Sequence, residues 1–391
     1  MSEKPDDLCP QPETPPPQST RSFAPPIYPA SVYACDNTAQ AEALLGGAGQ
    51  GYVYQRDGHP NADMLADKCR RLHGAQRAAV TSSGMAAVAA VLLSQTRAGD
   101  HLVVSNQLYG RTLEVLTSET QRLGIEHTVV DTCDVGATSA ALRDNTRLVV
   151  AETISNPLLR VADIGALATA AHARGALLVI DNTFATPAVC RPLELGADLV
   201  VESVSKIMNG HSDVMLGLVC GGEAVWQRVP LAVSAWGLAS SPFDCWLASR
   251  GLATLHLRIE RACANAQLAA EMLAEHPRVE RVEFPGLTSH RDHQLANRQF
   301  DGRHGWMVTF HLSGGRAAAD AFLLGAGRIP FCPSLGELST TLSHPQSTSH
   351  RGLTDGEREG LGIHGGTIRL SIGTESPEYV LQAIREGLGD R

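Results

Sequence analysis

The sequence predicts an α/β protein with a mostly parallel, doubly covered sheet in a large domain and a smaller α+β domain after it. Five short apolar or β-branched runs lie between residues 101 and 203, and helical segments separate them. A strand–helix–strand repeat of this kind is typical of parallel sheets that are covered on both faces. A long helical segment, residues 248–276, then leads into further strand-like runs.

Each expected element rests on its own pattern. The strands of the large sheet are HLVVS (101–105), EHTVV (126–130), RLVVAE (147–152), ALLVID (176–181) and DLVVES (198–203). Helices are expected over 61–74, with Asn61 near the N-cap, over the Ala-rich segment 82–96, over 111–124, and over 162–175, which Gly175 closes. The C-terminal strands are VERVEF (279–284), WMVTFHL (306–312) and TIRLSI (367–372).

The N-terminal part differs in composition. Residues 1–29 hold nine of the 21 prolines and cannot bury enough apolar surface to fold alone, so we expect a disordered tail. Residues 30–60 show weak periodicity and several glycines, which indicates an extended arm that packs on something else. The expected regions are therefore the tail (1–29), the arm (30–60), the large domain (61–247) and the C-terminal domain (248–391).

Composition excludes several classes of protein. The net charge of -9 argues against a nucleic-acid binder. We find no apolar run of eighteen residues and no signal-peptide core, so we expect a cytoplasmic protein without a membrane span. The nine cysteines are scattered without a Cys-x-x-Cys pair, which favours reduced thiols over disulfides or a zinc site.

Lysine usage draws attention to one position. Only three of the 32 basic residues are lysines: Lys4, Lys68 and Lys206. Lysine becomes a nucleophile when its pKa is lowered, whereas arginine cannot. Lys206 directly follows an apolar strand and should point into a cleft, while Lys4 lies in the tail and Lys68 on a solvated helix face. Codon bias with leftover lysines, or a surface lysine in a turn, are the alternatives.

Ligands of such sheets bind beyond the carboxyl ends of the strands. The side chains expected there are Tyr109, Glu152, Asn156, Asp181, Asn182 and Lys206. Asp181 could pair with the protonated ring nitrogen of pyridoxal phosphate (PLP), although an isolated Asp-Asn more often caps a turn. The segment TSSGMAAV could bind an anion at a helix N-terminus or be a simple N-cap. Tyr109 could stack on a cofactor or serve in packing.

Eight segments together resemble the Cys/Met-metabolism family of fold-type-I PLP enzymes, which includes cystathionine γ-synthase, cystathionine γ-lyase and methionine γ-lyase. They are YVYQRDGHPN, TSSGMAAV, LYGRT, ETISNP, VIDNTFATP, SVSKIMNGHSDVMLG, PSLGELSTTLSHPQSTSH and IRLSIGTE, in the family's order and spacing. The resemblance runs from about Ala24 to the end of the chain.

The resemblance implies roles for individual residues. Lys206 would hold PLP as a Schiff base and move protons, Asp181 would bind the pyridinium nitrogen, and Tyr109 would stack on the ring and act on the leaving group. The phosphate would be bound by Gly84, Met85, Ser203 and Ser205, with Thr183 also in the cofactor site. Tyr54 and Arg56 would reach the phosphate of a neighbouring subunit, because relatives are homo-oligomers, typically tetramers. Arg369 would bind the substrate α-carboxylate, helped by Asn156 and Ser334.

The implied activity is a PLP-dependent elimination of the Cγ or Cβ substituent of a sulfur amino acid, giving a 2-oxo acid and ammonia, as in cystathionine γ-lyase. The alternative is γ-replacement on an activated homoserine, as in cystathionine γ-synthase or a sulfhydrylase. An aminotransferase or a non-catalytic protein would lack parts of this motif set. Arg111 and Pro333 depart from the family pattern, and Arg111 is expected near the leaving-group end of the substrate, where it would favour an acidic tail.

Overall fold

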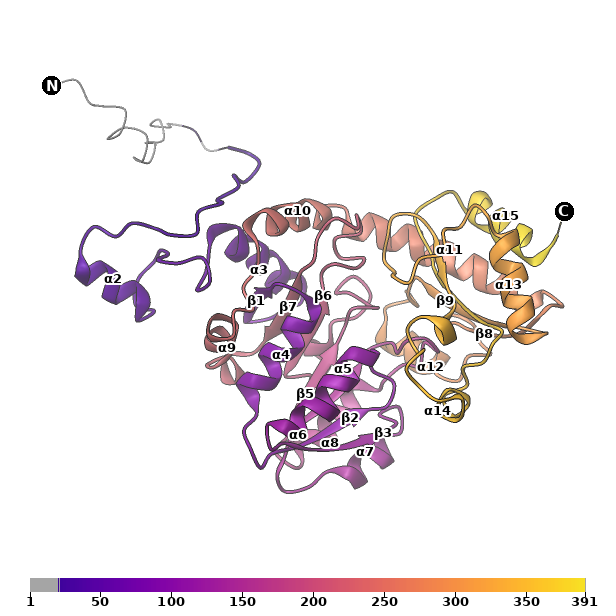
Figure 1. Cartoon of the computed structure of the whole chain (residues 1–391), viewed down its shortest axis with the longest axis horizontal. Coiled ribbons are helices and arrows are strands. Elements are labelled where there is room, and N and C mark those ends of the chain that lie inside the picture. The colour runs from indigo at the N-terminus through magenta and orange to yellow at the C-terminus, as the bar shows by residue number, and fades with distance from the viewer. Residues whose placement is uncertain (1–19, 21, 391) are drawn as a thin grey trace.

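The computed structural model describes residue 20 and residues 22–390, so most of the expected tail lies outside the described residues. Three parts follow one another along the longest axis in Figure 1: the N-terminal arm, a large central domain and a C-terminal domain. The arm is extended, as expected, except for one helix, α2 (Thr38–Leu45), which Asn37 caps. Figure 1 shows α2 standing away from the central domain.

A seven-stranded sheet forms the centre of the large domain, in the order β1-β7-β6-β5-β4-β2-β3. The five strands from β6 to β3 are parallel, and β7 runs antiparallel to both β6 and β1. The bounds are β1 Arg77–Thr81, β2 His101–Ser105, β3 Glu126–Val130, β4 Thr146–Glu152, β5 Leu177–Asp181, β6 Leu199–Ser203 and β7 Gly217–Gly221.

The five expected strands are present, but β1 and β7 were not predicted. The β7 sequence, GLVCG, begins and ends with glycine, which is unusual in a strand interior. The structure explains Gly217, because a Cβ at this position would collide with the backbone of Ser83, which precedes the helix that follows β1. A short glycine-bounded strand gives no periodic pattern, so the sequence did not reveal it.

Helices cover both faces of this sheet, as the apolar strands require. Alternate strand residues such as Leu178 and Val179 belong to two separate apolar clusters, one on each face. Helices α3 and α8 cover one face, while α4, α5 and α9 cover the other. The bounds are α3 Pro60–Leu72, α4 Gly84–Gln95, α5 Gly110–Glu114, α6 Thr120–Arg122, α7 Val135–Ala141, α8 Ile164–His172 and α9 Val229–Ala235, with a π-helical turn over Val115–Glu119.

The start of α3 differs from the expected one. His59, not Asn61, is the N-cap, because its Nδ1 accepts a hydrogen bond from the backbone of Ala62 at 3.1 Å and Pro60 occupies the first helical position. Asn61 is buried instead and binds the arm: its side chain accepts from Tyr28 N and donates to Pro26 O, each at 2.8 Å.

The expected long helix at 248–276 is two helices, α10 (Pro242–Leu252) and α11 (Leu255–Glu275). The break, at residues 253 and 254, lies beside the guanidinium of Arg258, which is buried and donates to the carbonyl oxygens of Gly251, Ile207 and Met208 and to Thr254 Oγ1. A side chain that binds the Gly251 carbonyl stabilises the end of α10 at that point. The same guanidinium fixes the backbone that follows Lys206.

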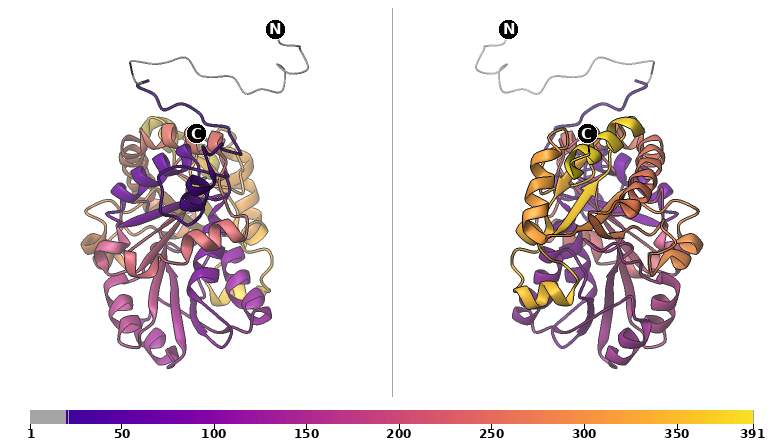
Figure 2. Two further views of the ribbon diagram at one scale, coloured as in Figure 1. Left: turned by 90° about the vertical axis from the view of Figure 1, so that its left-hand side faces the viewer. Right: turned by 90° about the vertical axis from the view of Figure 1, so that its right-hand side faces the viewer.

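The C-terminal domain holds a four-stranded antiparallel sheet in the order β10-β11-β9-β8. Helix α15 contacts both α11 and α13, and lies between them in the right-hand view of Figure 2. The bounds are β8 Val279–Glu283, β9 Met307–Leu312, β10 Thr341–Ser343, β11 Thr367–Ser371, α12 His293–Gln299, α13 Gly315–Gly325, α14 Asp355–Gly360 and α15 Pro377–Leu388.

Helix α11 belongs to two apolar cores. Its first half, with Leu255 and Ile259, packs in the core of the large domain. Its second half, with Ala269 and Leu273, packs in the core of the C-terminal domain. The two domains therefore share one continuous helix.

Candidate active site

A cavity of about 310 Å³ lies at the carboxyl ends of the parallel strands, where the C-terminal domain covers them. Its lining brings together residues that are far apart in the sequence. Of the residues singled out from the sequence, those that line it are Gly84, Met85, Tyr109, Glu152, Asn156, Asp181, Thr183, Ser203, Ser205, Lys206, Pro333, Ser334 and Arg369.

One end of the cavity is the N-terminus of the twelve-residue helix α4. Ser83 caps this helix by accepting a hydrogen bond from Ala86 N at 3.0 Å. Gly84 is required here, because a Cβ would lie 2.8 Å from the Cβ of Ser203. The close approach of β6 places Ser203 beside the free backbone N–H groups of α4. A helix N-terminus next to a hydroxyl group suits a phosphate.

The two serines before Lys206 are not equivalent. Ser205 Oγ donates to the Leu216 carbonyl oxygen at 3.1 Å and accepts from Leu216 N at 2.9 Å. Within the described residues Ser203 Oγ has no such partner, while its backbone N–H donates to Thr183 Oγ1 at 2.9 Å. The Ser203 hydroxyl is therefore the freer donor of the two.

Lys206 projects from the loop after β6 into the middle of the cavity. Its Nζ donates to Ser334 Oγ at 3.1 Å. Burial lowers the pKa of Lys206 and nearby Arg369 lowers it further, whereas the carboxylate of Glu337 acts in the opposite direction. A lowered pKa increases the neutral fraction of the amine, which is the nucleophilic form.

Two carboxyl groups end neighbouring strands below the lysine. Asp181 ends β5 and Glu152 ends β4, and the two residues are paired in register. Burial raises the pKa of Asp181 to about 6 although hydrogen bonds from Thr183 lower it. Burial, and then the charge of Asp181, raise the pKa of Glu152 well above its usual value. A buried carboxylate without a cation is suited to receive a positively charged ring nitrogen.

The opposite wall holds a buried guanidinium. Arg369, on β11, donates from Nη1 to Asn156 Oδ1 at 2.7 Å and from Nη2 to the backbone oxygen of Ser334 at 3.2 Å. Its Nε is buried and has no partner within the described residues. Burial lowers the pKa of Arg369 to about 10. An incompletely paired buried guanidinium is a natural binding group for a carboxylate.

Tyr109 caps the start of α5 at the mouth of the cavity. Its backbone N–H donates to Glu152 Oε1 at 2.6 Å, which fixes the residue above the strand ends. The side chain remains 45% exposed. This position leaves the phenol free to cover a ring bound in the cavity.

Four residues expected at the site lie outside this lining. One is Asn182, whose buried amide donates to Glu202 Oε1 at 2.8 Å. Tyr54 is 43% exposed on the arm, and the guanidinium of Arg56 lies 5.1 Å from its ring centroid. Arg111 lies on the exposed face of α5 and forms a salt bridge with Glu114 at 2.5 Å. The structure therefore does not bring Arg111 to the leaving-group end of the cavity.

Sequence reasoning missed two residues that shape the site. Gly336 has a φ of +87° and packs on the backbone of Lys206 and Ile207, which places Ser334 beside Lys206. Glu337 contributes the charge that acts on both Lys206 and Arg369. The motif SLGE (334–337), a glycine followed by an acidic residue, is the part of the sequence that could have drawn attention to these two residues. The apolar lining, including Phe184 and Met215, carried no signal in the sequence.

The described part of the chain has neither a candidate metal site nor a candidate membrane-spanning helix. It contains no group of three or more His, Cys, Asp or Glu side chains placed to hold a metal ion. None of the helices in that part is long and apolar enough to cross a membrane.

Four features together define a fold-type-I PLP-dependent enzyme. They are a lysine that follows one parallel strand, an Asp at the end of the neighbouring strand, a helix N-terminus suited to a phosphate, and a buried arginine opposite them. Comparison with known proteins narrows this class. The model of the family described as "Cys/Met metabolism PLP-dependent enzyme" matches residues 10–389. The chain belongs to this family, and PLP is its cofactor.

Similar proteins carry several different names. L-methionine γ-lyase of Porphyromonas gingivalis is 40% identical over 94% of this chain and 92% of its own length. O-succinylhomoserine sulfhydrylase of Pseudomonas aeruginosa is 38% identical over 93% and 90%. The solved structure of cystathionine γ-synthase from Xanthomonas oryzae pv. oryzae in complex with cystathionine has a TM-score of 0.88 at 38% identity, over 94% of this chain and 92% of that one.

Proposed function

We propose that this chain catalyses the PLP-dependent γ-elimination of a sulfur amino acid with an uncharged tail, of which methionine is the representative. The observation that carries the proposal is the charge of the cavity lining. Lys206 and Arg369 are the only basic side chains that line the cavity in the described part of the chain. Both have other tasks, so an acidic tail would find no cation from this chain. The remaining lining includes Met85, Val88, Phe184, Met215 and Leu335, which suit a thioether.

The residues present fit the cofactor. Gly84, Met85 and Ser203, with Ser205, would hold its phosphate, Asp181 its ring nitrogen and Tyr109 its exposed face, while Lys206 would bind it covalently. The fit is supported by the space that Gly84 leaves at the start of α4 and by the buried, cation-free carboxyl group of Asp181. When bound, the cofactor supplies an electron sink for the negative charge that develops on the substrate.

Arg369 would orient the substrate. Its unpartnered Nε and the adjacent Nη groups can bind an α-carboxylate, while Asn156 holds the guanidinium in place at 2.7 Å. A carboxylate fixed at this wall directs the substrate Cα toward Lys206, which lies beside Ser334 on the same side of the cavity. Orientation of this kind is a large part of the rate enhancement in enzymes.

Two groups would move protons. Lys206 Nζ, with its lowered pKa, would accept the proton from the substrate Cα and return one to the carbon chain. The hydroxyl of Tyr109, at the mouth of the cavity, would donate a proton to the departing sulfur. For methionine the products are methanethiol, 2-oxobutanoate and ammonia, with one water consumed.

The alternative reaction for this chain is γ-replacement, in which a thiol takes the place of the leaving group on Cγ. It would use the same residues, and the similarity to a sulfhydrylase and to a cystathionine γ-synthase is the reason to test it. The two reactions differ in whether a thiol captures the substrate carbon chain before hydrolysis. The test measures ammonia and 2-oxo acid from methionine, cystathionine and O-succinylhomoserine, with and without an added thiol. We expect kcat/KM for methionine to exceed that for the acidic-tailed substrates by at least about 10-fold, because a distal carboxylate would lack a charged hydrogen bond.

In the same assay the ammonia released should equal the 2-oxo acid formed. Consumption of O-succinylhomoserine with incorporation of the thiol and little ammonia would instead identify a γ-replacement enzyme. Stoichiometric 2-oxo acid without ammonia would identify an aminotransferase.

A further inference from the structure

The loop that carries Asn156 is held from the C-terminal domain. Residues 154–161, called here the Asn156 loop, form a narrow hairpin closed by the bridge between Ile154 and Val161. Within it Ser155 N donates to Arg160 O at 2.9 Å, and Arg160 N donates to Ser155 Oγ at 3.1 Å. The hairpin is internally rigid, so a force on Arg160 reaches Asn156.

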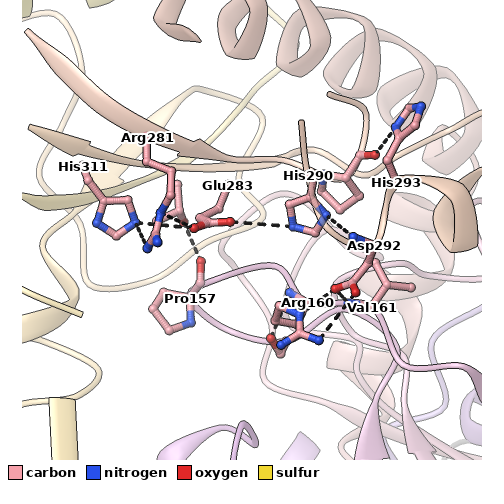
Figure 3. Close-up of polar contacts among 12 residues, drawn as sticks. Pro157, Arg160, Val161, Arg281, Glu283, His290, Asp292, His293 and His311 are labelled. Atoms are coloured by element: carbon pink, nitrogen blue, oxygen red, sulfur yellow. Dashed lines mark hydrogen bonds and ion pairs between the residues drawn. The ribbon is translucent and has the colours of Figure 1, made fainter. Parts of the chain in front are cut away.

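Asp292, just before α12, binds the far side of this loop. Its Oδ2 accepts from Arg160 Nε at 2.6 Å and from Val161 N at 3.1 Å, and its Oδ1 lies 3.5 Å from Arg160 Nη2. Only 11% of the Arg160 side chain and 13% of the Asp292 side chain are exposed. Figure 3 shows Asp292 directed at Arg160 and Val161. A charge pair that is little exposed is screened less by salt than a surface pair.

A second contact lies at the other end of the loop. Thr309 Oγ1, on β9, donates to the Pro157 carbonyl oxygen at 2.6 Å, and Thr309 is fully buried. Apolar packing also anchors the loop, because Ile154, Leu159 and Val161 are buried in the core of the large domain. Asn156, Pro157, Leu158 and Arg160 line a cavity of about 640 Å³ between the two domains. Asp292 and Thr309 are the polar contacts by which the C-terminal part of the chain adds to this packing and sets the two ends of the loop.

Asn156 also lines the active-site cavity, where its Oδ1 accepts from Arg369 Nη1 at 2.7 Å. We propose that Asp292 is a positioning residue for substrate-carboxylate binding: through Arg160 and Val161 it sets the Asn156 loop, and through Asn156 it orients the guanidinium of Arg369. The inference rests on the proposed role of Arg369 as the carboxylate-binding residue. Loss of the Asp292 carboxylate removes the charged contact that holds Arg160, which borders the cavity of about 640 Å³.

The matched control is Asp198, which makes the same kinds of bond elsewhere. Its Oδ2 accepts from His172 Nε2 and from Leu178 N, each at 2.8 Å, at the amino end of β5 away from the site. The Asp198 side chain is 22% exposed. Asp198→Asn therefore perturbs a comparable polar contact without touching the Asn156 loop.

The test uses two ligands of the holoenzyme that cannot be cleaved at sulfur. Norleucine has the shape of methionine and an α-carboxylate, whereas pentylamine is the same chain without the carboxylate. Binding is followed by the visible absorbance of the cofactor. Asp292→Asn should weaken norleucine binding by about 5- to 30-fold and pentylamine binding by less than about 2-fold, since a charge-assisted contact that orients the carboxylate site is lost. KM for the turned-over substrate should rise more than kcat falls.

Further variants separate positioning from folding. Arg160→Gln should show a smaller, equally carboxylate-selective loss. The loss in the double variant should be less than the product of the two single losses, because both changes break the contact between Arg160 and Asp292, although Arg160 also lies 3.7 Å from Asp131 and Asp292 also binds Val161 N. Asp292→Glu should restore part of the norleucine affinity. Should Asp292→Asn fail to fold, Arg160→Gln carries the same test.

Equal weakening of norleucine and pentylamine in Asp292→Asn would show a purely structural role and overturn the inference. Unchanged norleucine binding, or a carboxylate-selective loss in Asp198→Asn, would also overturn it. A wild-type protein without any preference for norleucine would overturn the carboxylate role of Arg369 itself. None of these outcomes depends on which sulfur amino acid the enzyme consumes, so the proposed elimination reaction is tested separately.

Discussion

Gly336→Ala should disable the site although residue 336 touches neither substrate nor cofactor. The position has a φ of +87°, and an added Cβ would lie 2.9 Å from the carbonyl carbon of Lys206 and closer still to the backbone nitrogen of Ile207. Left-handed backbone costs a residue with a Cβ about 1–2 kcal/mol. Overpacking against the backbone costs about 1–3 kcal/mol more, so the native geometry becomes less favourable by about 2–5 kcal/mol.

The chain can relieve this cost only by moving the Ser334–Gly336 segment away from Lys206. A displacement of about 1 Å would break the 3.1 Å bond between Lys206 Nζ and Ser334 Oγ and misplace Arg369, whose Nη2 binds the Ser334 carbonyl. We expect kcat/KM to fall about 100-fold, together with a lower Tm. Gly327→Ala is the control, because Gly327 has no positive φ and no atom within 4 Å of an added Cβ. If Gly336→Ala matched Gly327→Ala in Tm and kcat/KM, the packing argument would be refuted.

Three further predictions address the cofactor, Arg111 and the arm. PLP affinity of the apoprotein should fall as the pH drops through about 6, because Asp181 then becomes protonated and loses the charge that pairs with the ring nitrogen. Titration of the wild-type protein and of Asp181→Asn with PLP at several pH values checks this prediction. An equal fall in PLP affinity in the variant would assign the pH dependence to another group. Arg111→Ala should change KM for methionine and for cystathionine by less than about 2-fold, since its exposed pair with Glu114 is worth little; a selective rise for cystathionine would restore the acidic-tail hypothesis. Lys206→Ala should be inactive, and Arg56→Ala should bind PLP weakly. If Arg56 serves a neighbouring subunit, subunit exchange between the two variants should regenerate activity. No recovery of activity in the mixed oligomers would place Arg56 outside the site.

Features of the fold and the site that depend on neighbouring residues could be predicted from the sequence, whereas contacts between distant residues could not. Local patterns placed the five parallel strands, and because parallel strands end at one edge, they also placed Asp181 and Lys206 near each other. The N-cap of α3 is His59, two residues before Asn61, which was expected near the cap; Asn is a common N-cap residue and His is not, so the sequence did not indicate the exact position. The contact between Arg160 and Asp292 joins residues 132 positions apart, and no local pattern predicts such a pair.

Arg111 shows the limit of reasoning from neighbours in the sequence. It lies two residues after Tyr109, and two residues turn an α-helix by about 200°. Its side chain therefore lies on the opposite side of α5, where Glu114 at i+3 binds it. Proximity along the chain placed the backbone near the site, whereas the helical period directed the guanidinium away from it. The apolar lining was equally hidden, because Phe184 and Met215 look like ordinary core residues in the sequence.

Helix α11 has a consequence for how the protein unfolds and for how it can be divided. Since Leu255 and Ile259 complete one core while Ala269 and Leu273 complete the other, a cut at residue 247 or 248 would leave the large domain without part of its own interior. The two domains should therefore melt together rather than in sequence. A chimera that exchanges C-terminal domains between relatives would have to cross over inside this helix, between residues 263 and 266, where membership of the two cores changes.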